Sequence, residues 1–168
     1  VDTVNSHTTK IGSLETNLNK VSTGQNKWLL EMFEKGEGID AESPITMEHI
    51  IGKTLIKAVL VDDSVTSNQS QFGNQYLGRA TTHVYLDMDY NWETTATSDD
   101  GSTMYVNGTF VATLTSCAPT AITISFKQGW NKITWVYNEG IGGDGWDFNP
   151  RLTKLPQVKY KNAYPMTK

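Results

Sequence analysis

One stretch of the sequence decides the fold: Ser98-Asp99-Asp100-Gly101-Ser102-Thr103-Met104-Tyr105-Val106-Asn107-Gly108-Thr109-Phe110-Val111-Ala112. Residues 104–106 are an apolar run, Asn107-Gly108 is a turn dipeptide, and residues 109–112 are a second run of mostly strand-forming residues. Asn-Gly between two such runs strongly predicts a hairpin, because a type I′ turn requires positive φ at both central residues. The sequence therefore predicts a β-hairpin from Met104 to Leu114.

Two adjacent carboxylates and a glycine, Asp99, Asp100 and Gly101, stand at the entrance to this hairpin. At this position the carboxylates would present hard oxygen ligands at one end of a sheet, where a calcium ion can be held. The same residues are also typical of an Asx-type turn, in which the aspartates only cap main-chain N–H groups. The residues alone leave both interpretations open.

Several other segments show the patterns of strands. The runs 27–34 and 55–61 are rich in strand-forming residues, and the run 44–51 predicts a short helix with Ser43 as its N-cap. Alternation of apolar and polar residues, typical of a strand with one buried face, places apolar side chains at Val84, Leu86, Met88, Tyr90, Trp92, Ile122, Ile124, Phe126, Ile133, Trp135 and Tyr137. Short strands joined by turns indicate an antiparallel β-sandwich rather than a parallel α/β sheet.

The first 24 residues differ in composition from the rest. Apolar residues recur there in a heptad pattern that only His7 interrupts, at Val4, Ile11, Leu14, Leu18 and Val21. A helix this short and this rich in Asn, Thr and Ser is not stable alone in water. We therefore expect residues 1–24 to be the C-terminal end of a coiled coil that self-associates through residues 1–23. The alternative is a lone amphipathic helix packed on its own domain.

Composition excludes several classes of protein. The net charge is −4 and 19% of the residues are charged, so the chain has no basic surface for nucleic acid or for a membrane. It contains no apolar run long enough to insert into a bilayer. One cysteine, Cys117, allows no internal disulfide, and His7, His49 and His83 lack the spacing of a zinc site. Nucleophile and phosphate-loop motifs are absent from the sequence, and we do not expect an enzyme.

Two segments resemble landmarks of the protective-antigen-type β-sandwich domain. Residues 97–108 resemble its core, in which a Ser-Asp-Asp-Gly turn precedes a hairpin, and residues 129–138 look like its next glycine and alternating apolar strand. The similarity covers the last two-thirds or so of the chain. It implies a mainly β fold, with an antiparallel protective-antigen-like sandwich over residues 25–168 after the short coiled-coil helix.

In the flocculin-type adhesins of this family the paired aspartates hold calcium, and the calcium binds sugar hydroxyls. The resemblance therefore implies that Asp99 and Asp100 are calcium ligands joined by a cis peptide. It also implies that the loop after residue 137 completes the site, with a side-chain oxygen from Asn138 and carbonyl oxygens from Gly140 and Gly142.

The segment Glu139–Phe148 is unusually rich in glycine, which lets a backbone approach a ligand closely. By this resemblance the sugar would lie near Asp99, Asp100, Asp144 and Trp146. Trp130 is a second candidate for stacking on the apolar face of a sugar, although both tryptophans also suit a hydrophobic core. The alternative for the loop is a flexible connection between two strands.

A coiled coil that leads into a calcium-lectin-like sandwich resembles the tail fibres and tail-tip proteins of bacteriophages of Gram-positive hosts. We accordingly expect a non-enzymatic head that binds cell-surface glycan, in a virion or another extracellular setting. Self-association through residues 1–23 would give a homotrimer by analogy with phage fibres, with a dimer as the second possibility. Two alternatives are a structural virion module without a ligand and an accessory domain of a glycan-degrading enzyme.

Overall fold

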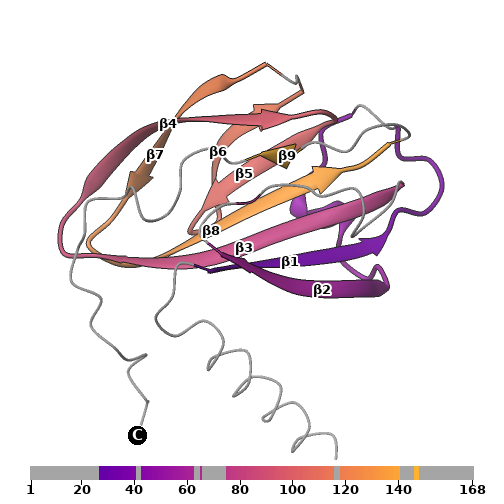
Figure 1. The fold of residues 1–168 in the computed structure, drawn as a ribbon, viewed down its shortest axis with the longest axis horizontal. Coiled ribbons are helices and arrows are strands. Elements are labelled where there is room, and N and C mark those ends of the chain that lie inside the picture. Colours follow the sequence, from indigo (N-terminus) through magenta and orange to yellow (C-terminus); the bar gives the residue numbers. More distant parts are fainter. Residues whose placement is uncertain are drawn as a thin grey trace, which may run out of the picture. The chain divides into compact units, whose positions relative to one another are not determined.

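The computed structural model describes residues 27–40, 43–62, 65, 75–115, 118–140 and 146–147 (Figure 1). All of them belong to one compact unit, residues 26–159. The predicted coiled coil over residues 1–24 lies outside the described residues, and so does Cys117. Self-association through residues 1–23 therefore stays a prediction.

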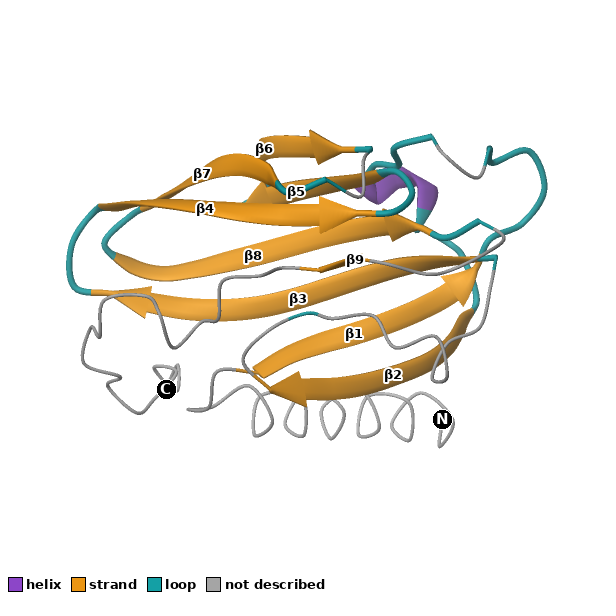
Figure 2. Ribbon diagram, turned by 45° about the horizontal axis from the view of Figure 1, so that its top comes forward, coloured by secondary structure: helices purple, strands orange, loops and turns teal. Residues whose placement is uncertain are grey.

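The described part of the chain is mainly β, as predicted, and its strands form two antiparallel sheets. The larger sheet has the order β2-β1-β3-β8-β5-β6, and the smaller one has the order β7-β4-β9. The first four strands of the larger sheet can be followed from bottom to top in Figure 2. The strands are β1 (Lys27–Glu34), β2 (Leu55–Asp62), β3 (Tyr76–Leu86), β4 (Tyr90–Ser98), β5 (Ser102–Val106), β6 (Thr109–Leu114), β7 (Thr120–Phe126), β8 (Gly129–Asn138) and β9 (Trp146–Asp147).

One hydrophobic core joins the two sheets. The alternation predicted for residues 122–126 is confirmed, because every second side chain of β7 is buried. The core cluster draws buried side chains from both sheets, among them Trp28, Ala80, Val84, Met104, Ile133 and Trp135 from the larger sheet and Trp92, Ala96, Ile122, Ile124 and Phe126 from the smaller one. Burial of so much aromatic and branched surface is the main stabilising contribution to such a fold.

The hairpin predicted from Asn107-Gly108 is confirmed. β5 and β6 pair antiparallel, and the two turn residues have φ values of 52° and 80°. The turn is also fastened to β8, because the Asn107 N–H donates to the carbonyl of Lys132 at 2.8 Å and the Asn107 side chain donates to the buried Asn131 side chain at 2.9 Å. Asn107 therefore serves both the turn geometry and the packing of the turn on the sheet.

The alternation over residues 84–92 predicted a single strand, but the structure divides these residues between two strands. β3 ends at Leu86, β4 begins at Tyr90, and Met88 lies exposed in the connection between them. The connection is held by Asp89, whose carboxylate accepts hydrogen bonds from the Gln128 N–H at 2.8 Å and from the Lys127 ammonium at 2.7 Å. Because Met88 is apolar, the alternation continues through the connection, and the sequence pattern does not indicate the turn.

The helix predicted over residues 44–51 is also wrong. The structure has one short 3-10 helix here, η1 (Met47–His49), and its N-cap is Thr46. Ser43 lies further upstream, where its main-chain carbonyl accepts a hydrogen bond from the side chain of Asn138. The hydroxyl of Ser43 donates to Oδ2 of Asp40 at 3.4 Å, so this side chain does not cap the helix.

Candidate functional site

The acidic pair and the end of β8 lie side by side. β5 and β8 are antiparallel neighbours with Ser102 opposite Tyr137, so the residues before β5 meet the residues after β8. The Asn138 N–H donates to the carbonyl of Gly101 at 2.9 Å, and the Gly140 N–H donates to Oδ2 of Asp100 at 2.6 Å. The structure thus brings together Asp100, Asn138 and Gly140, which the resemblance had grouped as candidate ligands.

A third segment, residues 40–44, completes this site and was not recognised from the sequence. The amide nitrogen Nδ2 of Asn138 donates to the carbonyl oxygens of Asp40 at 2.5 Å and of Ser43 at 2.8 Å. A Cβ on Gly101 would lie 2.3 Å from the nitrogen of Pro44 and from the carbonyl carbon of Ser43. Gly101 is therefore required by the close approach of another backbone, and its φ is not in the left-handed region.

Asn138 is the most informative residue of the site. Its side chain is fully buried, and its Oδ1 has no hydrogen-bond partner among the described residues. The two carbonyls that accept from Nδ2 fix the orientation of the amide, because only the nitrogen can donate. A buried acceptor without a partner is unfavourable by about 1–3 kcal/mol. A ligand that bound this oxygen would offset that cost.

The turn that carries the aspartates has its own hydrogen bonds. The hydroxyl of Ser98 donates to the main-chain carbonyl of Asp100. The peptide between Asp99 and Asp100 is trans, where the resemblance implied a cis bond. Asp100 caps a main-chain N–H, as the Asx interpretation proposed, but this N–H belongs to Gly140, which lies far along the chain.

A buried lysine lies beside the acidic residues. Lys35 follows β1 and is only 9% exposed, and its ammonium donates to the carbonyl of Glu139 at 2.8 Å. Burial lowers the pKa of Lys35, and the charges of Asp100, Glu139 and Asp40 oppose that shift in this order. This contact was not predicted from the sequence, in which Lys35 begins a glycine-containing loop over residues 35–40, because its partner Glu139 lies 104 positions away.

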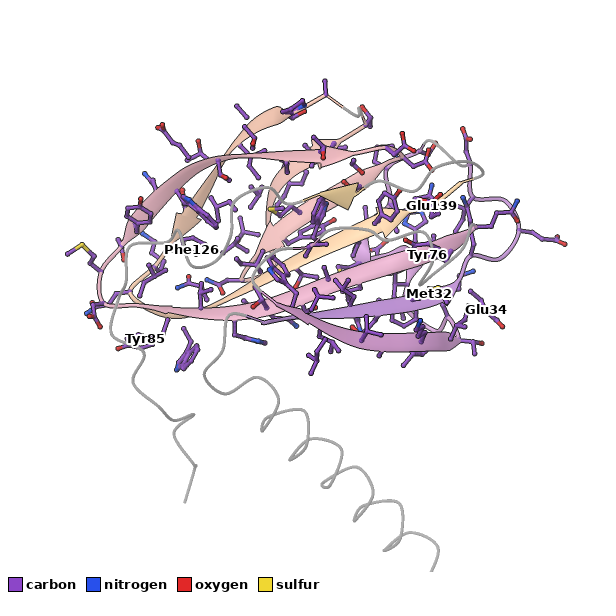
Figure 3. The ribbon with its side chains drawn as sticks, viewed as in Figure 1. Met32, Glu34, Tyr76, Tyr85, Phe126 and Glu139 are labelled. Carbon is purple, nitrogen blue, oxygen red and sulfur yellow. The ribbon has the colours of Figure 1, made fainter. Side chains whose placement is uncertain are left out.

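Glu139 itself is fully buried and adds a further acidic group to this end of the sheet. Its carboxylate accepts a hydrogen bond from the hydroxyl of Tyr137, whose ring packs 6.1 Å from that of Tyr76. Figure 3 shows Glu139 and Tyr76 at one end of the sheets and Phe126 and Tyr85 at the other. The negative charge of the site is therefore gathered at one end of the molecule.

The described residues of the glycine-rich loop, 139–140 and 146–147, lie beside the acidic turn. The loop leaves at Asn138, and the chain is described again at β9, where Trp146 pairs with Ser98 and Asp147 with Thr97. The carbonyl of Gly140 accepts a hydrogen bond from the Gln75 N–H at 2.9 Å, so this predicted ligand already has one protein partner. Gly142, Asp144 and the side chain of Trp146 lie outside the described residues, and their predicted roles stay predictions.

Trp130 does not belong to this site. It lies near the start of β8, eight residues before Asn138 and thus roughly 26 Å away along the strand. Its ring is 5.5 Å from that of Tyr85 in an edge-to-face arrangement, and the side chain is 37% exposed. A sugar held at the acidic turn cannot stack on Trp130.

Within the described ranges, no three His, Cys, Asp or Glu side chains gather as they would around a metal ion. No helix in that part of the chain is long and apolar enough to cross a membrane. Comparisons with known protein families, curated proteins and solved structures found no match to this chain.

Proposed function

We propose that the chain is a non-enzymatic module that binds cell-surface glycan at the acidic turn, with calcium as the ion that contacts the sugar. The observation that carries this proposal is the buried Oδ1 of Asn138, which has no partner among the described residues. It belongs to a residue whose main chain is hydrogen-bonded to Gly101, directly after the two aspartates. An acceptor oriented by two hydrogen bonds and left without a donor suits a cation.

The donor set is of the kind that calcium selects. Carboxylates from Asp99 and Asp100 and an amide oxygen from Asn138 are hard oxygen ligands, which favour calcium over softer metals. Calcium takes six to eight oxygens, and residues 139–140 and 146–147 of the glycine-rich loop lie beside the turn, so this loop is the proposed source of further oxygens. When bound, calcium would leave open positions that vicinal hydroxyls of a sugar can fill.

The sandwich fold and the expected oligomer are part of the same proposal. Two antiparallel sheets with one shared core are compatible with a protective-antigen-like sandwich. Several weak sugar-binding sites in one assembly bind more tightly than a single site, because a high effective concentration favours the second contact. A trimer or dimer formed through residues 1–23 would supply several such sites, as in a phage tail fibre or another extracellular adhesin.

A binding assay on a glycan array or on bacterial cell walls tests the proposal. The variant Asp100→Asn removes one charge and keeps an oxygen that can accept from the Gly140 N–H, so we expect the fold to persist. We expect binding by the unaltered chain to be lost in chelator and restored by calcium, and binding by the variant to be lost in both conditions.

Asp89→Asn is the matched control. It removes the same charge from an exposed connection at the opposite end of β3 and β8, and its glycan binding should equal that of the unaltered chain. Glycan binding that survives both chelator and Asp100→Asn would refute the calcium-dependent site. Loss of binding in Asp89→Asn as well would mean that net charge, and not the site, governs the assay.

A structural module without a ligand is the second candidate, and Lys35 favours it. The ammonium already supplies a positive charge to Asp100 and Glu139 and a donor to a carbonyl of the loop. Under this alternative the acidic turn fastens the first loop to the end of β8. Calcium would then leave the unfolding temperature unchanged, and no glycan would bind.

A further inference from the structure

We propose that Lys35 is an internal competitor of the calcium ion, so that its ammonium and the metal are alternative cations for one acidic site. This inference rests on the proposed function, since it concerns the regulation of the same site. It assigns a role to a residue that lies more than sixty positions before the aspartates in the sequence.

The position of the ammonium carries the argument. Nζ of Lys35 donates to the carbonyl of Glu139 at 2.8 Å. Glu139 stands between Asn138, whose Oδ1 has no partner among the described residues, and Gly140, whose N–H donates to Asp100. A metal that bound Asn138 and Asp100 would therefore lie against the residue that the ammonium now holds.

The charges around Lys35 also support competition between the ammonium and calcium. Asp100, Glu139 and Asp40 are the acidic groups that act on the Lys35 ammonium, and the side chain is almost fully buried. Charges in a buried place such as this interact far more strongly than they would in water. A calcium ion brought to Asp100 is repelled by the ammonium unless the lysine side chain moves away, and either effect lowers the affinity for calcium.

Burial of a lysine ammonium also lowers the stability of the fold unless hydrogen-bond acceptors or opposite charges surround it. Desolvation of an ammonium is unfavourable, and here the carbonyl of Glu139 and the nearby carboxylates offset it. The competitor role predicts that the Lys35 ammonium occupies the site at low calcium concentration. Calcium replaces it at the millimolar concentrations that extracellular calcium modules use.

The test uses the whole chain and calcium alone, without glycan. Lys35→Gln removes the charge and keeps a donor for the Glu139 carbonyl, so we expect a calorimetric calcium dissociation constant at least about tenfold lower than that of the unaltered chain. We also expect a lower unfolding temperature in chelator and a larger rise when calcium is added. Lys127→Met, which removes an equal charge from an exposed side chain at the other end of the sheet, should change none of these three quantities.

A second measurement needs no variant. The rate at which an acylating reagent modifies the amine of Lys35, followed by mass spectrometry, should be well below that of Lys127 in chelator. Millimolar calcium should raise it, because the metal displaces the side chain. This measurement decides the matter if Lys35→Gln does not fold.

Two results overturn the inference. One is a folded Lys35→Gln variant that binds calcium no more tightly than the unaltered chain. The other is modification of Lys35 at a rate that equals that of Lys127 or that calcium leaves unchanged. Neither result involves a sugar, so the competitor role can fail while calcium-dependent glycan binding stands, and the reverse.

Discussion

Replacement of Gly101 by alanine is the sharpest structural test of the acidic turn. The added Cβ would lie 2.3 Å from the nitrogen of Pro44, 2.3 Å from the carbonyl carbon of Ser43 and 2.4 Å from its oxygen. All three atoms belong to main chain, so no side-chain rotation can relieve the overlap. Residues 43–44 must move away from the turn, or the turn must move away from them.

The cost can be estimated from the contacts that this movement breaks. Overpacking of a tight site is unfavourable by about 1–3 kcal/mol. Displacement of residue 43 also removes the hydrogen bond from Nδ2 of the buried Asn138, and a lost bond of this kind contributes about 1 kcal/mol. We therefore expect Gly101→Ala to lower the free energy of unfolding by roughly 2–4 kcal/mol, the sum of those two contributions.

Urea unfolding followed by tryptophan fluorescence measures this loss, because five tryptophans report on the protein. The midpoint should fall while the slope with denaturant stays unchanged. Gly38→Ala is the control: Gly38 has a φ of 81° but open space around its Cβ position, so only backbone strain of about 1–2 kcal/mol is expected. A Gly101→Ala variant as stable as the unaltered chain would refute the close approach of residues 43–44.

Two further predictions concern the opposite end of the sheet. Burial and, secondarily, the charge of Lys132 lower the pKa of His83; the unfolded chain therefore binds more protons, and the free energy of unfolding should fall as the pH drops below the unfolded value of about 6.5. Urea unfolding at several pH values should show this fall, and His83→Gln should flatten it; an unchanged slope would contradict the shift. Asn131→Ala removes a buried side chain that bonds the main chain of Lys127 and the side chain of Asn107, so it should cost about 2–3 kcal/mol. Asn91→Ala, at an exposed position, should change stability by less than about 0.5 kcal/mol, and equal losses in the two variants would disprove the role of the Asn131 network.

Local chemistry explains what could be predicted from the sequence. The Asn107-Gly108 turn requires two positive φ values, which few residue pairs supply, so the hairpin was evident. The period of two in residues 122–126 was equally clear, because β7 buries one face and exposes the other. The connection over residues 87–89 was missed, since apolar Met88 fell on the same period.

The site was only partly predictable. The proximity of Asp100 to Asn138 and Gly140 was anticipated through family resemblance and not through any pattern of residues. Lys35 and Ser43 were missed because their contacts bridge more than ninety residues of sequence and no local rule encodes them. The need for glycine at position 101 is steric and long-range, so it also leaves no local trace.

The contacts of the acidic turn have a consequence for the order in which the chain folds. They join residues that are 95 to 104 positions apart, from residues 35–43 to residues 138–139. Closing such large loops is entropically unfavourable and slow, and the pairings of β1 with β3 and of β3 with β8 bring the two ends together. During synthesis the acidic site therefore cannot form until β8 has left the ribosome. Any sugar-binding capacity would thus arise only after β8 has paired with β3, and a chain truncated before residue 138 would have none.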